Sequence, residues 1–289
     1  MIIAAVLYLI ISIPFIFFYL EKRQRNQLRT GEKLINWMTC RGSNQDLLFF
    51  SKGEKESEQG YKFYTGLVNE ILFYKRELGG YQKKNFQEVK KALLGDIRFE
   101  KKVEKEMRGS LFQYICLGII TWVFIGGSHQ ILGEKISMRL EVLLFILCFQ
   151  LTGVLFYQVV CEKLKKKDFY FFNLYYAPLF RFFSLIYLNL PVGMILEKSG
   201  FEVFYRKEPS DWRAVLDDLR GLIDKWKSQG GEVRSELNDI VEEVYFLRDL
   251  SFEKYKEKIQ FLRLIFLGVF FLGPYLFYLS VLLSSFLIV

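Results

Sequence analysis

The side chains that most often carry enzymatic or metal chemistry are few and scattered in this chain. Its 289 residues include one histidine, His129, and four cysteines, Cys40, Cys116, Cys148 and Cys161. Zinc sites need Cys and His at short repeated intervals, and disulfide frameworks need paired cysteines. The cysteines here are unpaired in spacing, and two of them lie in apolar stretches. We therefore predict no zinc site and no disulfide scaffold, and we interpret His129 as an interfacial residue rather than a catalyst.

The sequence also lacks the motifs of common catalytic and nucleotide-binding sites. It contains no Gly-x-x-x-x-Gly-Lys-Ser/Thr phosphate loop, no Gly-x-Ser-x-Gly nucleophile turn and no His-Glu-x-x-His zinc pair. We therefore predict a protein that is not an enzyme and needs no cofactor. Any ATPase that acts with it must be a separate chain.

Charged and apolar residues are strongly segregated along the chain. Of the 40 Lys and Arg, 20 lie in 21–110, 18 in 162–263 and only 2 in 111–161. A bilayer core requires about 20 consecutive apolar helical residues. Four stretches meet this requirement: Ile2–Leu20, Leu111–Leu132, Leu140–Val160 and Leu264–Val289. The sequence therefore predicts an all-α integral membrane protein with four transmembrane helices.

The positions of the basic residues predict how these spans are oriented. The net charge of +8 comes from residues that flank apolar spans, which favours a membrane protein over a nucleic-acid-binding protein. Lys and Arg are retained in the cytoplasm, so 21–110 and 162–263 should lie inside and 133–139 outside. We predict a multi-pass protein of the bacterial inner membrane with both termini outside, in contact with lipid and not with nucleic acid.

The stretch 169–196 is apolar and aromatic but does not fit the four-span scheme. Arg181 lies near its middle, and Pro178 and Pro191 interrupt it. An Arg at the centre of a span costs about 2.5–3.5 kcal/mol on the insertion scale. We expect helices at the cytoplasmic interface, or packed against the spans, with their aromatic side chains at headgroup level. A re-entrant or spanning segment remains an alternative.

Two segments of the chain match each other at a fixed offset of 153 residues. Residues 96–105 and 249–258 share six of ten positions, and each segment is followed by an apolar span. The matched pairs are Asp96/Asp249, Phe99/Phe252, Glu100/Glu253, Lys101/Lys254, Glu104/Glu257 and Lys105/Lys258. Repeats of this kind indicate duplicated architecture. We expect Asp96 and Asp249 to hold equivalent places and to cap or orient their helices.

The elements upstream of the two matched segments also correspond. An amphipathic helix is predicted at 66–78 and another at 211–228, each followed by a pair of glycines. These pairs, which suit the turn of a helical hairpin, are Gly79, Gly80, Gly230 and Gly231. The sequence therefore predicts two duplicated cytoplasmic helical bundles, at about 60–110 and 200–263.

Six regions summarise the predicted organisation. They are a transmembrane anchor (1–20), a charged cytoplasmic segment (21–60), a first helical repeat with its span (61–132), a short outside loop with the third span (133–160), a basic and aromatic interfacial segment (161–199) and a second helical repeat with its span (200–289).

With these features the chain resembles the inner-membrane platform proteins of type II secretion and type IV pilus machines. Those proteins carry two copies of a helical F domain, and the extra N-terminal span here is similar to the tight-adherence pilus branch. The resemblance covers about 60–289 and rests on the duplication and the architecture. The family's Gly-Glu-x-Ser-Gly signature has its nearest match at Leu196–Gly200, with Leu in place of the first Gly.

The resemblance implies an oligomeric scaffold that couples a cytoplasmic secretion ATPase to extraction of pilin or pseudopilin subunits, with a related platform protein as a further partner. The matched residues Asp96 to Lys101 and Asp249 to Lys254 would then be candidates to face the ATPase. The alternatives are a polytopic transporter or an ion-motor stator-like component, which would also have several spans.

Overall fold

The structure is a computed structural model. It describes residues 26–38, 60–78, 83–132, 140–186, 188, 190–205, 210–229 and 233–287. Every regular element in these ranges is a helix, which confirms the all-α prediction for the described part of the chain. The predicted span at 2–20 lies outside these residues.

The described residues divide into two compact units. Unit 1 holds those of Lys102–Lys167 and Lys254–Val289, and unit 2 holds those of Gln24–Lys101 and Asp168–Glu253. Each unit is therefore assembled from stretches that are far apart in sequence. The long helix α4 (Lys83–Leu132) contributes to both units, as does α9 (Arg234–Leu267).

Unit 2 has a large hydrophobic core to which helices of both predicted bundles contribute. Besides parts of α4 and α9, its helices include residues 26–38, α3 (Tyr64–Leu78), α6 (Tyr170–Ile186), α7 (Val192–Ser199) and α8 (Arg213–Gln229). The core includes Leu67 of α3, Val89 of α4, Leu219 of α8 and Leu237 of α9. The helices of the two predicted bundles share this core. The duplication of the bundles stays a prediction.

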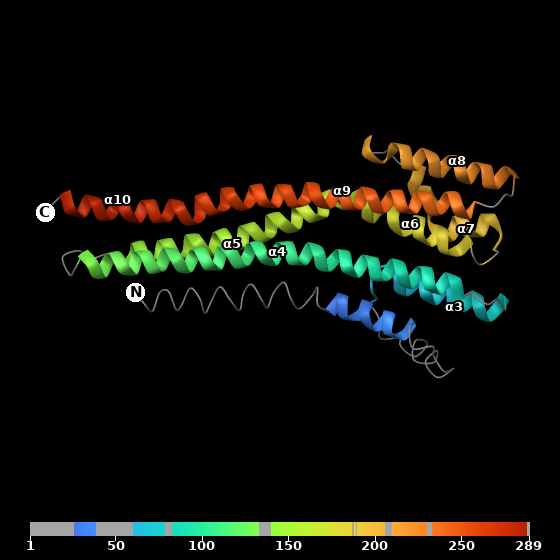
Figure 1. Ribbon diagram of the computed structural model, residues 1–289, viewed down its shortest axis with the longest axis horizontal. Coiled ribbons are helices and arrows are strands. Elements are labelled where there is room, and N and C mark those ends of the chain that lie inside the picture. Colours follow the sequence, from blue (N-terminus) through green and yellow to red (C-terminus); the bar gives the residue numbers. More distant parts are fainter. Residues whose placement is uncertain are drawn as a thin grey trace. The chain divides into compact units, whose positions relative to one another are not determined.

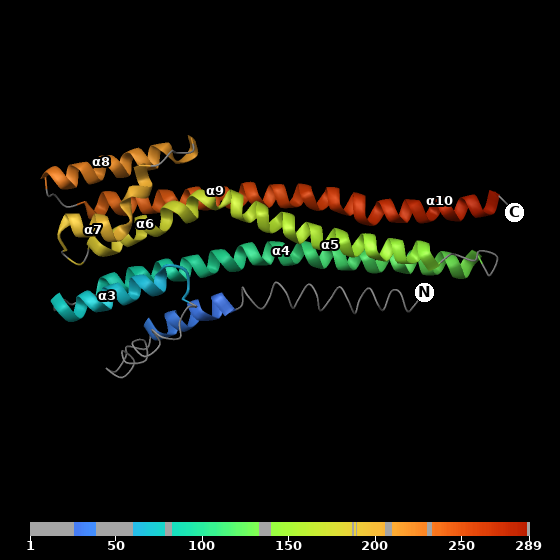
Figure 2. The same ribbon diagram turned by 180° about the vertical axis from the view of Figure 1, so that it is seen from behind.

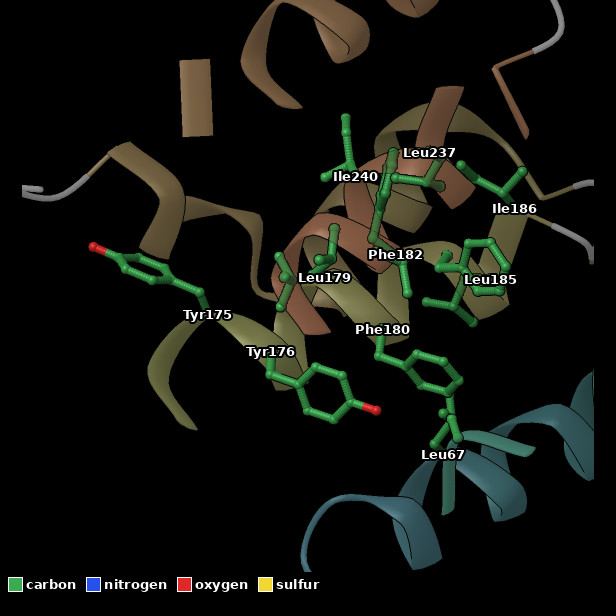
Figure 3. Close-up of a cluster of buried hydrophobic side chains, with 14 of the residues drawn as sticks. Leu67, Tyr175, Tyr176, Leu179, Phe180, Phe182, Leu185, Ile186, Leu237 and Ile240 are labelled. Carbon is green, nitrogen blue, oxygen red and sulfur yellow. The ribbon is translucent and has the colours of Figure 1, made fainter. Parts of the chain in front are cut away.

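Helix α6 lies at the centre of this core. It is apolar nearly all round and buries ten side chains, although Pro178 interrupts its backbone hydrogen bonding. Figure 3 shows Phe180 directed toward Leu67 of α3, while Leu179 and Phe182 lie beside residues of α9. The sequence predicts the aromatic residues of 169–196 at headgroup level, whereas most of those in α6 are buried among helices of unit 2, with Tyr170 exposed. A helix that is apolar on every side is typical of a buried core helix as well as of a membrane-associated one.

Unit 1 contains the apolar parts of three long helices. These are α4, α5 (Leu140–Asp168) and the succession of α9, the π-helical η4 (Gly268–Leu272) and α10 (Gly273–Leu287), which run on as one continuous helical path (Figure 1). Among the described residues, three helical stretches are long and apolar enough to cross a membrane: Phe86–Ser128, Glu141–Asp168 and Arg234–Ser284. They contain the larger part of three of the four predicted spans and by their length and composition suggest a membrane protein.

Polar side chains join the helices of unit 1. Trp122 Nε1 of α4 donates to Gln150 Oε1 of α5 at 3.0 Å, and both side chains are buried. The hydroxyls of Ser128 and Tyr278 lie 2.7 Å apart, which links α4 to α10. Hydrogen bonds of this type are a usual means of joining helices in an apolar environment. Both views of the fold show α4 and α5 side by side here (Figures 1 and 2).

The π-helical turn η4 lies just before Pro274. Pro274 has no backbone N–H, so the carbonyl four residues before it loses its helical partner. Gly273 instead donates its N–H to the carbonyl of Gly268. The ring of Phe270 lies against Gly153 of α5 so closely that an added Cβ there would overlap it. The π-helical turn η4 therefore lies in close contact with α5, and only glycine at position 153 permits this contact.

Candidate functional site: the matched segments and the Asp96 network

Asp96, the first residue of the first matched segment, is a buried carboxylate within unit 2. Its side chain accepts a hydrogen bond from Tyr61 Oη at 2.8 Å, and Lys62 Nζ lies 3.0 Å from Oδ1 and 2.8 Å from Oδ2. The same ammonium group contacts Glu100 Oε1 at 2.8 Å. A buried charge persists only when it is paired and hydrogen-bonded. Tyr61 and Lys62, which precede α3, provide both conditions and fasten that end of α3 to α4.

Lys62 adopts an unusual backbone conformation to reach the two carboxylates. Its φ is +47°, in the left-handed region that non-glycine residues seldom occupy. Burial lowers the pKa of the Lys62 ammonium, but the attraction of Asp96 and Glu100 outweighs burial and raises that pKa above its ordinary value of 10.5. The ammonium is therefore charged throughout the physiological pH range. No sequence motif singles out Lys62, because its partners lie more than thirty residues away.

Three tyrosine hydroxyls form a second polar connection in unit 2. Tyr64 Oη of α3 lies 2.7 Å from Tyr176 Oη of α6, which lies 2.9 Å from Tyr245 Oη of α9. Burial raises the pKa of all three phenols, so each stays protonated and can both donate and accept. The chain of hydroxyls satisfies polar atoms inside an aromatic core and links three helices. Sequence analysis missed this cluster, because the three tyrosines show no common spacing.

The two matched segments meet through their phenylalanines. Phe99 and Phe252 are both buried, and their rings pack edge to face with centroids 5.9 Å apart. The guanidinium carbon of Arg248 lies 4.5 Å from the centroid of the Phe99 ring, and Arg248 Nε is 3.5 Å from Oδ1 of Asp249. The residue beside Asp249 therefore reaches the phenylalanine of the other segment.

The remaining matched residues occupy less similar surroundings. The side chain of Asp249 is 59% exposed, whereas that of Asp96 is 2% exposed. Lys101 Nζ contacts Glu32 Oε1 at 2.7 Å on the surface, and Glu253 and Lys254 are exposed. Neither aspartate lies at a helix end, so neither caps its helix. The alternative, that each orients its helix, stays a prediction.

The glycine pairs predicted to form hairpin turns, Gly79 with Gly80 and Gly230 with Gly231, lie outside the described residues. The helices on either side of each pair are described. They are α3 and α4 around the first pair and α8 and α9 around the second.

The signature-like stretch Leu196–Gly200 forms the end of α7. Gly200 has φ +71°, and its N–H donates to the carbonyl of Glu197 at 3.2 Å. Gly suits this left-handed position, because the conformation is costly for residues with a Cβ. The stretch therefore serves as a helix C-terminus, which agrees with a helix-end role for Glu197.

The geometry is that of a structural assembly. The charged and phenolic groups of the Asp96 network and the tyrosine chain bind one another and join helices distant in sequence. Among the described residues, no group of three or more His, Cys, Asp or Glu is placed to hold a metal ion. The arrangement can fix the relative positions of α3, α4, α6 and α9 within unit 2.

No protein-family model, curated protein or solved structure matches this chain.

Proposed function

We propose that the chain is a membrane scaffold that serves as the inner-membrane platform of a type II secretion or type IV pilus machine of the tight-adherence type. In this function, unit 2 receives movement from a cytoplasmic ATPase, and the spans of unit 1 pass it to pilin or pseudopilin subunits in the membrane. The observation that carries the proposal is the continuity of α4 and α9, each of which belongs to both units.

Helix continuity supports mechanical coupling for a simple geometric reason. Helix α4 has 50 residues, which at 1.5 Å per residue make it about 75 Å long, more than twice the thickness of a bilayer core. Its backbone hydrogen bonds run without a break from the Asp96 network to the apolar stretch. A displacement applied to one end of such a helix is carried along its axis.

The shared core of unit 2 supports a location of both large loops on one side of the membrane. Residues of 60–101 and of 168–253 are buried against one another in that core. Because a bilayer cannot pass through a packed core, two loops that share a core must occupy the same compartment. The concentration of Lys and Arg in 21–110 and 162–263, which flank the spans, favours the cytoplasm for that compartment.

Site-specific photo-crosslinking in the native cells tests this function. A photoreactive amino acid is placed at Ala214 or Asp218, two exposed positions of α8, and in a control at Phe145, an exposed apolar residue of α5. We expect a crosslink to the secretion ATPase from the α8 positions and none from Phe145. Deletion of the gene should abolish pilus assembly or secretion. Normal assembly after deletion, or no ATPase adduct from either α8 position, would refute the proposal.

A further inference from the structure

A stripe of acidic and apolar side chains runs along the exposed face of α9 in unit 2. Phe246 and Leu250 are 67% and 41% exposed and lie one turn apart. Five exposed carboxylates lie on the same face, within about a third of the helix circumference at 100° per residue. They belong to Asp239, Glu242, Glu243, Asp249 and Glu253. The opposite face of α9, with Leu237, Val241 and Val244, is buried in the core. Helix α9 therefore has large apolar side chains on its exposed face as well as on its buried face.

The acidic character of this region contrasts with the rest of the chain. Residues 211–253 contain eleven Asp and Glu against six Lys and Arg, although the whole chain has a net charge of +8. Residues 83–108 of α4 have the opposite bias, with nine Lys and Arg against five Asp and Glu. The chain therefore carries two helix surfaces of opposite charge.

The exposed face of α4 presents a basic stripe that is shaped to receive another helix. Lys91 and Arg98 are exposed and lie seven residues apart, two helical turns along one face. Between them lies Gly95, and an added Cβ at that position would meet no atom within 4 Å. Gly in the middle of a helix costs about 1 kcal/mol relative to Ala. No described residue fills the low surface that Gly95 creates.

The register of the two helices brings these stripes to the same level. Phe99 of α4 contacts Phe252 of α9 at an offset of 153 within unit 2. Both helices pass from unit 2 into unit 1 along the chain, so they run parallel. At an offset of 153, Lys91 lies at the same height along the helix pair as the residue just after Glu243. Arg98 lies at the same height as the middle of the turn from Asp249 to Glu253. Phe246 and Leu250 are then level with the turns on either side of Gly95.

We propose that the acidic stripe of α9 in one copy of this chain binds the basic stripe of α4 in a second copy, with Phe246 and Leu250 packed over Gly95. Copies in one membrane share their orientation, so α4 and α9 of neighbouring copies run parallel at equal depth. The contact joins two different surfaces of the chain, and copies related by a rotation about the membrane normal close into a ring. This inference does not rest on the proposed function.

Charge reversal on each stripe tests the contact with the full-length chain. One variant carries Glu242→Lys and Glu243→Lys, and the other carries Lys91→Glu and Arg98→Glu. Two differently tagged copies are purified together in mild detergent, and the captured fraction and the mass by light scattering are measured. We expect the wild type to self-associate at low ionic strength and each variant to bind itself about tenfold more weakly, because like charges then face each other.

Mixing the two variants gives the decisive result. A mixture of the two variants should associate like the wild type, because each basic surface again meets an acidic one. A chain with all four changes should also recover association. Salt should weaken the wild-type contact, since the screening length falls from about 10 Å at 0.1 M to about 3 Å at 1 M.

A matched control has the same change in net charge away from the stripe. Asp218→Lys with Asp224→Lys alters two exposed carboxylates of α8. This control should associate like the wild type, and the helix content and melting temperature of every variant should match those of the wild type. The proposal is overturned if the wild-type chain is monomeric at low salt, even if it captures another protein. It is also overturned if the stripe variants associate normally, or if the mixture stays dissociated.

Discussion

Asp96 in α4 and Asp249 in α9 hold corresponding places in two matched segments but lie in opposite environments. Asp96 is buried and holds Tyr61 and Lys62, whereas Asp249 is exposed and contacts only the edge of Arg248 among the interactions described above. Phe99 and Phe252, three residues further on, are both buried and touch each other. The two segments therefore share their apolar anchor and differ in their polar connections.

This difference separates two roles that the matched residues could have. The phenylalanines lie where α4 and α9 meet, so either one supports both helices. The role of each aspartate depends on which side chains lie beside its helix. Only α4 has the Tyr61 and Lys62 pair at the start of α3 beside it. A matched polar position can thus be buried and structural in one segment and exposed in the other.

The largest expected effect comes from removing a phenylalanine. Phe99→Ala and Phe252→Ala should each lower the free energy of unfolding by about 3–5 kcal/mol, because a buried ring leaves a cavity. The double variant should cost less than the sum, since the two rings contact each other. Denaturant unfolding in detergent, followed by tryptophan fluorescence, measures these values. If Phe99→Ala lowered the free energy of unfolding by the expected amount and Phe252→Ala did not lower it at all, the two rings would not form a shared stabilising contact.

Neutralising each aspartate should change stability differently in the two segments. Asp96→Asn should cost about 2 kcal/mol, because it removes the charge that pairs with the Lys62 ammonium in a partly buried site. Asp249→Asn, the matched control, should change stability by less than about 0.5 kcal/mol, as exposed ion pairs usually do. Thermal unfolding of the two variants under one condition makes the comparison. Equal costs would contradict the distinction between a buried and an exposed aspartate.

The Asp96 network should also give unit 2 a characteristic dependence on alkaline pH. The pKa of Lys62 is raised in the folded state, so its stabilising contribution is complete below its ordinary value of 10.5 and is lost as pH rises through the raised pKa. Lys62→Met should therefore be less stable than the wild type at pH 8, by about 1–2 kcal/mol. This difference should shrink above pH 10.5. A difference that stays constant to pH 12 would mean that Lys62 acts through packing alone.

The smallest effect is expected at the surface pair of the first segment. Lys101 and Glu32 are about half exposed, so Lys101→Met should cost less than about 0.5 kcal/mol, and 1 M salt should abolish even that difference. Urea unfolding at low and high salt provides the measurement. A loss above 1 kcal/mol would place Lys101 among the structural residues together with Asp96.

The helices that the sequence predicts well are those with one clear physical requirement. The apolar stretches 111–132 and 140–160 lie in α4 and α5, because a bilayer demands about 20 apolar residues whatever surrounds them. The amphipathic pattern at 211–228 closely matches α8, which buries Val215, Leu219 and Leu222 on one face. Both requirements are local in sequence and could be recognised without knowledge of the fold.

Contacts between distant residues could not be recognised in the same way. The pairing of Lys62 with Asp96 and the hydroxyl contact of Tyr64 with Tyr176 join positions 34 and 112 residues apart. The sequence around α6 is apolar on all sides, so it could not distinguish a core helix from one at a membrane surface. The burial of α6 depends on helices α3, α8 and α9 folding around it.

The most direct test of the account concerns the compartment of the two halves of unit 2. Alkaline phosphatase and green fluorescent protein reporters are fused after Gly60 and after Gly230, in separate chains expressed in the native host. The account predicts that both positions are cytoplasmic, with green fluorescence and no phosphatase activity at either. Opposite compartments for Gly60 and Gly230 would contradict a shared core and the platform proposed from it.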